Sequence, residues 1–203
     1  MDSTIEALGI FKTLIDGEIR NMKNWNTKQF MIKLQQIINN GGKILHRAAF
    51  PLVHVGIESD YNEQYCIENN IPLFKVERTG GTIVSNIGDF DFVFVVNPFS
   101  KKWKNHKPIL LEKIVDLARE KEHTALIEKN DLLIDGYKVA SYSYREVPGG
   151  VYVAMHLSMS VDISLIMNIC KKPMVKVPKG LNDFGIYEED ILKIIEGLNE
   201  ELV

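Results

Sequence analysis

Short apolar runs, separated by turns rich in glycine, proline and asparagine, make up most of this chain. Residues 51–56 and 73–76 form apolar runs of strand length, and residues 90–96 alternate before becoming continuously apolar. Runs of this length with β-branched and aromatic residues predict buried strands. Two further strands are predicted over residues 125–127 and 132–134.

A hairpin signal organises the second half of the chain. Asp135-Gly136 is a two-residue sequence that typically joins two antiparallel strands. It predicts a returning strand over residues 138–144. After a second turn at residues 148–150, the apolar run over residues 151–163 predicts one long strand.

Helical periodicity appears in four places. Thr27, Asp60 and Pro108 are candidate first residues of three helices, the third running to about Glu122, and a fourth begins near Glu188. The residues expected on their inward faces are Phe30, Met31, Leu34, Ile37, Ile38, Tyr61, Tyr65, Cys66, Ile109, Leu110, Ile114, Leu117, Ile191, Ile195, Leu198 and Leu202.

The order of these elements bears on the fold class. Strands and helices are intermixed, and several strands are joined by tight turns. This favours an α+β (or mixed α/β) domain with a mixed central sheet over a doubly wound parallel sheet. At 203 residues, a single domain over 1–203 is expected, with an N-terminal helical portion over residues 1–45.

Composition narrows the function classes. A net charge of −3 offers no basic face for nucleic acid. The start of the chain lacks the features of a signal peptide, and no apolar run approaches the ~20 residues that span a bilayer. Two cysteines, Cys66 and Cys170, favour a reducing compartment over a disulfide framework. We therefore expect a cytoplasmic protein without nucleic-acid or membrane partners.

The most informative chemistry lies at the turn after residues 73–76. Arg78 directly precedes Thr79-Gly80-Gly81, and the β-branched run starting at Thr82 follows. Glycine has no side chain, so backbone at such a turn can approach a ligand closely. The arginine can form a fork of hydrogen bonds with a carboxylate or phosphate.

Together with Lys138, which follows the Asp135-Gly136 turn, this loop resembles the catalytic domain shared by lipoate–protein ligases, octanoyltransferases and biotin protein ligases. The lipoate–protein ligases are the closest group, and the Gly-Arg-Gly-Arg type of loop typical of biotin ligases is absent. The resemblance covers a core over residues 50–200 and rests on residues 51–56, 78–88, 130–141, 144–146, His156 and 180–183.

The chain also departs from the family pattern. Ser85 stands where the family has histidine, and Thr79 and Leu157 stand where it has glycine. Tyr142 is bulkier than the residue usual beside the family's lysine. Tyr142 and Leu157 are expected to shorten or reshape an acyl tunnel.

The resemblance implies an enzyme that attaches lipoate, octanoate or a related acyl group to a lysine of a lipoyl-type carrier domain. ATP and Mg²⁺ would supply an acyl-adenylate, and the Lys138 ammonium would stabilise negative charge during the reaction. No metal-ligating set is expected. The substrate- and nucleotide-binding residues that the resemblance implies are Arg78, Thr79, Gly80, Gly81, Thr82, Ile83, Val84, Ser85, Ser141 and His156.

Two alternatives stay open. Cys170 follows Lys138 at a spacing close to that of the octanoyltransferases, which carry the acyl group as a thioester, although the Pro-Cys-Gly signature is absent. A lone cysteine on an apolar helix is more often a small residue of the hydrophobic core. The second alternative is an inactive relative that binds a carrier domain or an acyl ligand. Because many lipoate ligases have an accessory domain, a separate partner chain is also expected.

Overall fold

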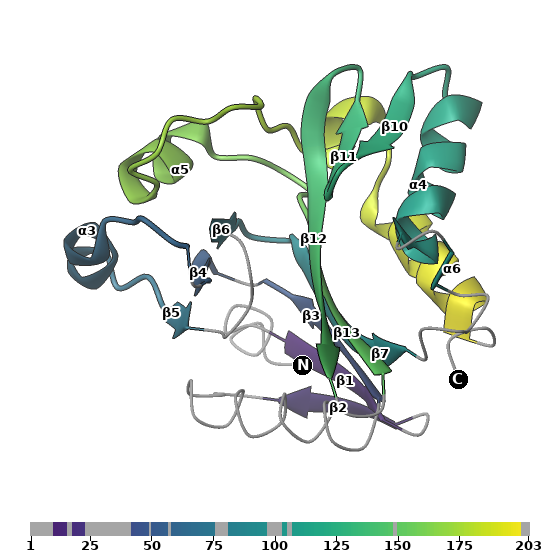
Figure 1. Ribbon diagram of the computed structural model, residues 1–203, viewed down its shortest axis with the longest axis horizontal. Helices are drawn as coiled ribbons and strands as arrows, with labels where there is room; N and C mark the ends of the chain where they lie inside the picture. The colour runs from purple at the N-terminus through teal and green to yellow at the C-terminus, as the bar shows by residue number, and fades with distance from the viewer. Residues whose placement is uncertain are drawn as a thin grey trace, which may run out of the picture.

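In the described part of the chain, a large and a small β-sheet, a separate pair of short strands and the helices around them make up the fold (Figure 1). The computed structural model describes residues 10–15, 18–22, 42–48, 50–56, 58–75, 81–96, 103–104, 107–147 and 150–199. The eight-stranded sheet has the order β10-β11-β12-β13-β7-β3-β1-β2, and the three-stranded sheet has the order β5-β4-β6.

The large sheet contains β1 (Ile10–Ile15), β2 (Glu18–Met22), β3 (Gly42–Arg47), β7 (Phe90–Val96), β10 (Ala125–Glu128), β11 (Asp131–Ile134), β12 (Tyr137–Val147) and β13 (Gly150–Leu157). The small sheet contains β4 (Leu52–Val55), β5 (Leu73–Lys75) and β6 (Thr82–Ser85). A separate pair is formed by β8 (Trp103–Lys104) and β9 (Lys107–Pro108). The helices are α3 (Glu63–Glu68), α4 (Ile109–Glu120), α5 (Ile163–Ile169) and α6 (Glu188–Asn199), with a 3₁₀-helix, η1 (Leu181–Phe184).

The strand pairing confirms the α+β class. Every pair in the large sheet is antiparallel. In the small sheet, β4 pairs in parallel with β5 and antiparallel with β6. The mixed pairing predicted for the central sheet is therefore found in the small sheet. Strands joined by short turns can pair only antiparallel, whereas β4 and β5 are connected through α3 and can pair in parallel.

The two faces of the large sheet have different coverings. Helices α4 and α6 lie on one side of it, and the small sheet with α3 and α5 lies on the other (Figure 1). Strand alternation directs Phe90 and Phe92 into the core shared with α4 and α6, where Ile114, Ile191 and Ile195 are buried. A second, smaller core lies between the small sheet, α3 and α5.

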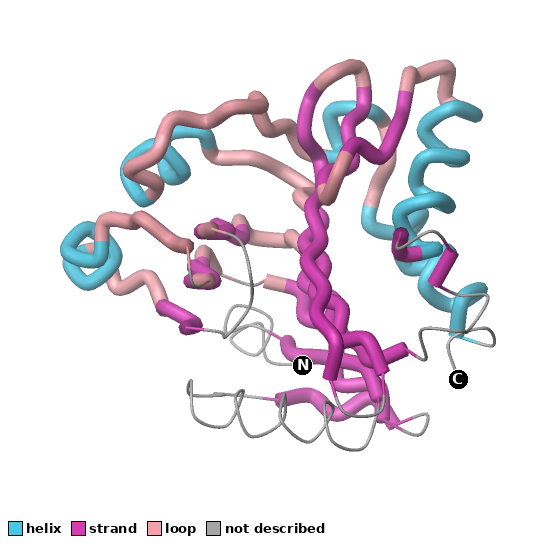
Figure 2. The backbone as a smooth tube through the Cα atoms, viewed as in Figure 1, coloured by secondary structure: helices cyan, strands magenta, loops and turns pink. Residues whose placement is uncertain are grey.

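The Asp135-Gly136 hairpin forms as predicted. Asp135 has φ 49° and Gly136 has φ 82°, the pair of positive values that such a turn requires. The Asp135 carboxylate also accepts hydrogen bonds from the Thr124 backbone N–H and hydroxyl, both at 2.9 Å. Strand β12 leaves this turn and pairs with β13 as a long twisted ribbon through the centre of the molecule (Figure 2).

The strand predicted over residues 151–163 is shorter than expected. Strand β13 ends at Leu157, because the backbone N–H groups of Met159 and Ser160 donate to the Asp89 carboxylate, at 2.7 and 3.3 Å, instead of to a neighbouring strand. Asp162 then caps α5 by accepting a hydrogen bond from the Leu165 N–H at 2.9 Å. The apolar run is thus a strand, a bend and a helix.

Most other predicted elements are confirmed, with small shifts. Asn62, and not Asp60, caps α3, since its side chain accepts a hydrogen bond from the Tyr65 N–H. Helix α4 begins after Pro108 as predicted. In α6 the expected inward residues that are described are buried, and Leu202 lies outside the described residues. The turn at residues 148–149 also lies outside them.

The N-terminal region differs from the helical portion expected over residues 1–45. Its described residues form strands β1 and β2 and the start of β3, all within the large sheet. The helix predicted after Thr27 lies outside the described residues. The assignment of the whole chain to one domain stays a prediction. In the part of the chain that the structure describes, no helix has the length and apolar character needed to span a membrane.

Gly180 provides a test of the packing beneath β13. A Cβ placed on Gly180 would overlap the Met159 carbonyl oxygen and lie 2.6 Å from the Ser160 Cα. Gly180→Ala should therefore lower the free energy of unfolding by about 2 kcal/mol, as overpacking does. Gly197→Ala is the matched control, because it is exposed on α6 with nothing within 4 Å of an added Cβ. The control should gain up to ~1 kcal/mol from helix propensity. Equal urea midpoints for the two variants would contradict this packing.

Candidate active site

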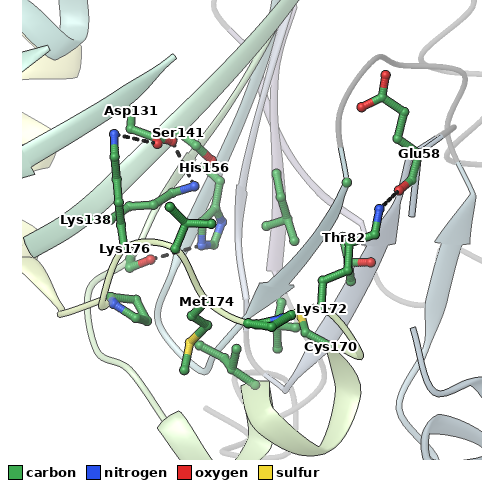
Figure 3. Close-up of a pocket in the computed structure, with 18 of the residues that line it drawn as sticks. Glu58, Thr82, Asp131, Lys138, Ser141, His156, Cys170, Lys172, Met174 and Lys176 are labelled. Atoms are coloured by element: carbon green, nitrogen blue, oxygen red, sulfur yellow. Dashed lines mark hydrogen bonds and ion pairs between the residues drawn. The ribbon is translucent and has the colours of Figure 1, made fainter. Parts of the chain in front are cut away.

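A cavity of about 720 Å³ lies between the small sheet and the β12–β13 ribbon (Figure 3). Its walls come from β6, from one face of β12 and β13, and from the segment that follows α5. The lining residues used below are Gly81, Thr82, Ile83, Val84, Glu128, Lys129, Asp131, Lys138, Ser141, His156, Ser158, Ile166, Cys170, Lys172, Met174 and Lys176.

One wall of the cavity carries two lysines that share a carboxylate. The Lys138 Nζ lies 2.8 Å from the Asp131 Oδ1, and the Lys176 Nζ lies 3.2 Å from the Asp131 Oδ2. Lys176 also lies 2.7 Å from the Glu128 Oε2. The hydrogen bond to Glu128 raises the pKa of Lys176, and Lys176 in turn lowers the pKa of Glu128. Both ammonium groups are thus held in place by carboxylates at the cavity surface.

The backbone explains how Lys176 comes to lie beside Lys138. The Lys138 N–H donates to the Val177 carbonyl and the Lys179 N–H donates to the Lys138 carbonyl, each at 3.0 Å. These bonds form an isolated parallel bridge between Lys138 and Pro178. The segment after α5 is therefore fastened along β12 at the lysine itself.

The glycine loop reaches the cavity through its second half. Gly81, Thr82, Ile83 and Val84 line the cavity. A Cβ on Gly81 would meet no protein atom within 4 Å, so this position borders open space. Arg78, Thr79 and Gly80 lie outside the described residues. Their predicted contacts with ligand stay a prediction.

Behind the cavity, three polar side chains meet at the Asp91 carboxylate. The His156 Nδ1 lies 2.9 Å from the Asp91 Oδ1, and the Ser85 hydroxyl donates to the Asp91 Oδ2 at 3.0 Å. The His54 Nε2 lies 3.1 Å from the same Oδ2. Because Asp91 and His156 come from the large sheet and Ser85 and His54 from the small sheet, this network joins the two sheets.

Asp89 holds the adjoining turns. Its carboxylate accepts the Asn86 N–H and the Met159 N–H, both at 2.7 Å. Burial raises the pKa of Asp89 to about 6, although the charge of His156 and these backbone donors act in the opposite direction. Burial alone would lower the pKa of His156. The hydrogen bond to Asp91 and the charges of Asp91 and Asp89 outweigh burial and the charge of Lys138, and raise this pKa.

Cys170 lines the cavity, but it is not the residue of an apolar helix face. Cys170 lies at the C-terminal end of α5, where its backbone forms an isolated antiparallel β-bridge with Tyr61. Burial, and secondarily the neighbouring Cys66, raise the pKa of the Cys170 thiol. Lys172 donates to the Glu58 carbonyl at 3.4 Å. Both cysteines are free thiols.

The structure therefore gathers most of the sequence-predicted site residues in one cavity. Lys138, Ser141, His156 and Cys170 line it, whereas Ser85 is fully buried behind it. The residues that the sequence did not indicate are Asp131, Glu128, Lys176 and Ser158. Among the described residues, no group of three or more histidine, cysteine, aspartate or glutamate side chains is arranged to hold a metal ion.

The two bulky departures do not reach the cavity, which corrects the expectation that they reshape it. Leu157 is fully buried in the core, because it lies between His156 and Ser158 and alternation directs it to the opposite face. Tyr142 is buried in the same core, and its hydroxyl donates to the Lys129 carbonyl at 3.2 Å. Neither side chain is among those that line the cavity.

Comparison with known proteins agrees with this geometry. Residues 50–186, more than half of the chain, match the family described as lipoyl protein ligase A/B catalytic domain. The chain belongs to this family. No curated protein is similar enough to match the chain. The resemblance that the sequence indicated is thereby confirmed.

Solved structures show the same fold. A bi-partite lipoate protein ligase from Thermoplasma acidophilum, studied with its E2 lipoyl domain, is 18% identical with a TM-score of 0.62, over 78% of this chain and 69% of that one. The putative lipoate protein ligase Ta0514 from the same organism, with bound lipoic acid, is 17% identical with a TM-score of 0.67, over 87% and 81%. A lipoate-protein ligase A bound with ATP is 18% identical with a TM-score of 0.66, over 87% and 81%.

The buried histidine gives this member of the family an expected pH dependence. The pKa values of His156 and Asp89 are both raised in the folded state. Each group therefore adds stability below its unfolded pKa and loses that contribution as pH rises through its folded pKa. The free energy of unfolding should fall between pH 6 and 8.5, mainly through His156, because Asp89 titrates near the lower end of this range. In His156→Gln this fall should be smaller, as measured by urea unfolding at both pH values. An identical pH dependence in the two proteins would remove His156 from the explanation.

Proposed function

We propose that this chain is the catalytic domain of a lipoate–protein ligase. It would activate lipoate, octanoate or a related acid with ATP and transfer the acyl group to a lysine of a lipoyl-type carrier domain. The observation that supports this most strongly is the position of Lys138. It lies on the wall of a cavity that it shares with the glycine loop, and it corresponds to the lysine of the family pattern.

Charge on the Lys138 wall suits both steps of the reaction. In the first step, a carboxylate oxygen of the acid attacks the α-phosphorus of ATP, and pyrophosphate leaves. In the second, the carrier amine attacks the acyl carbon, and AMP leaves. Negative charge develops beside the same phosphate in both, where a fixed ammonium stabilises it. Asp131 holds the Lys138 ammonium at 2.8 Å and so fixes its position at the cavity surface.

The other residues that line the cavity are suited to the acyl chain and to the phosphate groups of the substrates. Ile83, Val84, Ile166 and Met174 offer apolar surface to an acyl chain. Lys176, Lys129 and Lys172 add cations for phosphate groups. Mg²⁺ in nucleotide sites is held mainly by phosphates, water and one or two carboxylates, and Asp131 and Glu128 are the carboxylates of this wall. The structural neighbours with bound lipoic acid and ATP support these ligands.

Partners and compartment follow from the same proposal. The Thermoplasma acidophilum ligase is bi-partite and was studied with an E2 lipoyl domain, which supports a carrier domain and a separate accessory chain as partners. The free thiols of Cys66 and Cys170 suit a reducing cytoplasm.

The first test replaces Lys138. Lys138→Ala should lower the rate of acyl-adenylate formation from octanoate or lipoate and ATP by about 10²–10³-fold, because one fixed charge at the transition state is lost. Its melting temperature should change little, since the side chain borders the cavity. Lys193→Ala, exposed on α6, is the matched control and should react normally. Adenylate is measured by mass spectrometry. Wild-type rates in Lys138→Ala would remove this lysine from the mechanism.

A transferase that uses a Cys170 thioester is the second candidate, because Cys170 does line the cavity. Its raised thiol pKa opposes this role, since the nucleophile is the thiolate. We therefore expect Cys170→Ser to keep most of the adenylation and transfer activity.

Incubation with an acyl donor distinguishes the three candidate functions, which are the ligase, the transferase and the inactive relative. A thioester trapped on Cys170 after incubation with octanoyl-carrier protein, together with loss of transfer in Cys170→Ser, would establish the transferase instead. Absence of adenylate, thioester and transfer in the wild type would favour the inactive, ligand-binding relative. The finding that Tyr142 and Leu157 do not occupy the cavity supports an active protein.

A further inference from the structure

Ser158, directly after β13, occupies a position that the proposed ligase reaction does not use. Its hydroxyl oxygen lies 3.2 Å from the His156 Nε2. On the other side of the ring, the His156 Nδ1 lies 2.9 Å from the Asp91 Oδ1. Residues two positions apart along an extended chain point to the same side, and both Ser158 and His156 line the cavity. A hydroxyl and an imidazole at the cavity wall are therefore in contact in series with a carboxylate behind it.

The hydrogen bonds of His156 determine which ring nitrogen carries the proton in the neutral imidazole. When the ring is neutral, the Asp91 carboxylate selects the tautomer with the proton on Nδ1, which leaves the Nε2 lone pair facing Ser158. Asp91 cannot turn away readily, because the Ser85 hydroxyl donates to it at 3.0 Å and His54 lies 3.1 Å from it. This is the arrangement of nucleophile, base and orienting carboxylate that recurs in acyl transfer on unrelated folds.

Charges around the ring suit proton transfer. The Asp89 carboxylate lies 3.6 Å from the Nε2 and stabilises the imidazolium that forms when this nitrogen takes a proton. Burial lowers the pKa of His156, but the hydrogen bond to Asp91 and the charges of the two carboxylates raise it overall, so the ring acts as a base only at pH values where it is neutral. The nearest backbone donors are engaged, since the Ser158 N–H donates to Val139 and the Met159 N–H to Asp89. The Lys138 ammonium, on the same cavity surface, is a cation that can stabilise a developing oxyanion.

We propose that Ser158, His156 and Asp91 form a second acyl-transfer centre, which hydrolyses activated medium-chain acyl esters and thioesters. The Ser158 oxygen attacks the acyl carbon while its proton passes to the His156 Nε2. The bond to the leaving group breaks, and the leaving group takes that proton. Water then attacks the acyl-serine ester, passing one proton through His156 to the departing Ser158 oxygen. The products are the free acid and the protonated leaving group.

This activity is separate from adenylation, and the test keeps the two apart. The full chain is incubated with para-nitrophenyl octanoate, and release of para-nitrophenolate is followed by absorbance. Ser158→Ala should lower the rate by at least about 100-fold, as loss of a nucleophile does. The matched control is Ser160→Ala, two residues further on, since Ser160 is exposed and donates to the Ile87 carbonyl at 3.4 Å. The control should hydrolyse the ester at the wild-type rate.

A second measurement does not depend on the folding of any variant. Wild-type protein treated with an alkyl fluorophosphonate should carry one phosphonyl group, which peptide mass spectrometry should locate on Ser158. Labelling of Cys170, Lys138 or no residue would overturn the proposal, and so would wild-type hydrolysis by a folded Ser158→Ala. Adenylate formation in Ser158→Ala is measured in parallel. Its persistence, with hydrolysis lost, would show that the second centre is distinct from the ligase reaction.

Discussion

The geometry of this molecule depends on the contacts that the Asp91 carboxylate makes. Asp91 lies on β7 between Phe90 and Phe92, so that alternation buries the two phenylalanines against α4 and α6 and directs Asp91 to the opposite face. There it contacts His156 from the neighbouring strand of the large sheet and Ser85 and His54 from the small sheet. The cavity has one wall from each sheet, and this carboxylate sets how the walls face each other.

Because Asp91 is buried, its carboxylate needs several polar partners. A buried carboxylate without partners is strongly unfavourable, and loss of one partner from a buried ion pair typically costs about 3–5 kcal/mol. Two histidines and a hydroxyl therefore have to meet Asp91 at once, which fixes the relative position of β4, β6 and β13. Such a network contributes geometry more than net stability. The start of β6, where Thr82 lines the cavity, is positioned by the same network, because β6 is held at Ser85.

The parts of this structure that the sequence could predict are those whose cause is local. The Asp135-Gly136 turn is one, since its positive φ angles are a property of two adjacent residues. The strand over residues 90–96 is another. Lys138 was indicated by the resemblance to the family, together with the glycine loop upstream, and not by the turn alone. The end of β13 at Leu157 was missed, because the group that stops the strand is Asp89, about 70 positions earlier. Lys176 was missed for the same reason, since its partner Asp131 lies 45 positions earlier. Ser158 lies only two positions after His156, but the Asp91 carboxylate that orients this histidine lies 65 positions before it.

The replacement of the family's histidine by Ser85 shows how a local departure can be absorbed by neighbours. Ser85 keeps a hydrogen bond to Asp91, and His54 supplies an imidazole to the same carboxylate from the adjacent strand β4. Leu157 replaces a glycine without touching the cavity, because its side chain faces the core. A sequence comparison counts each of these as a lost feature. The structure shows a polar junction between the sheets and an open cavity, and these, more than the identity of residue 85, are what the proposed chemistry requires.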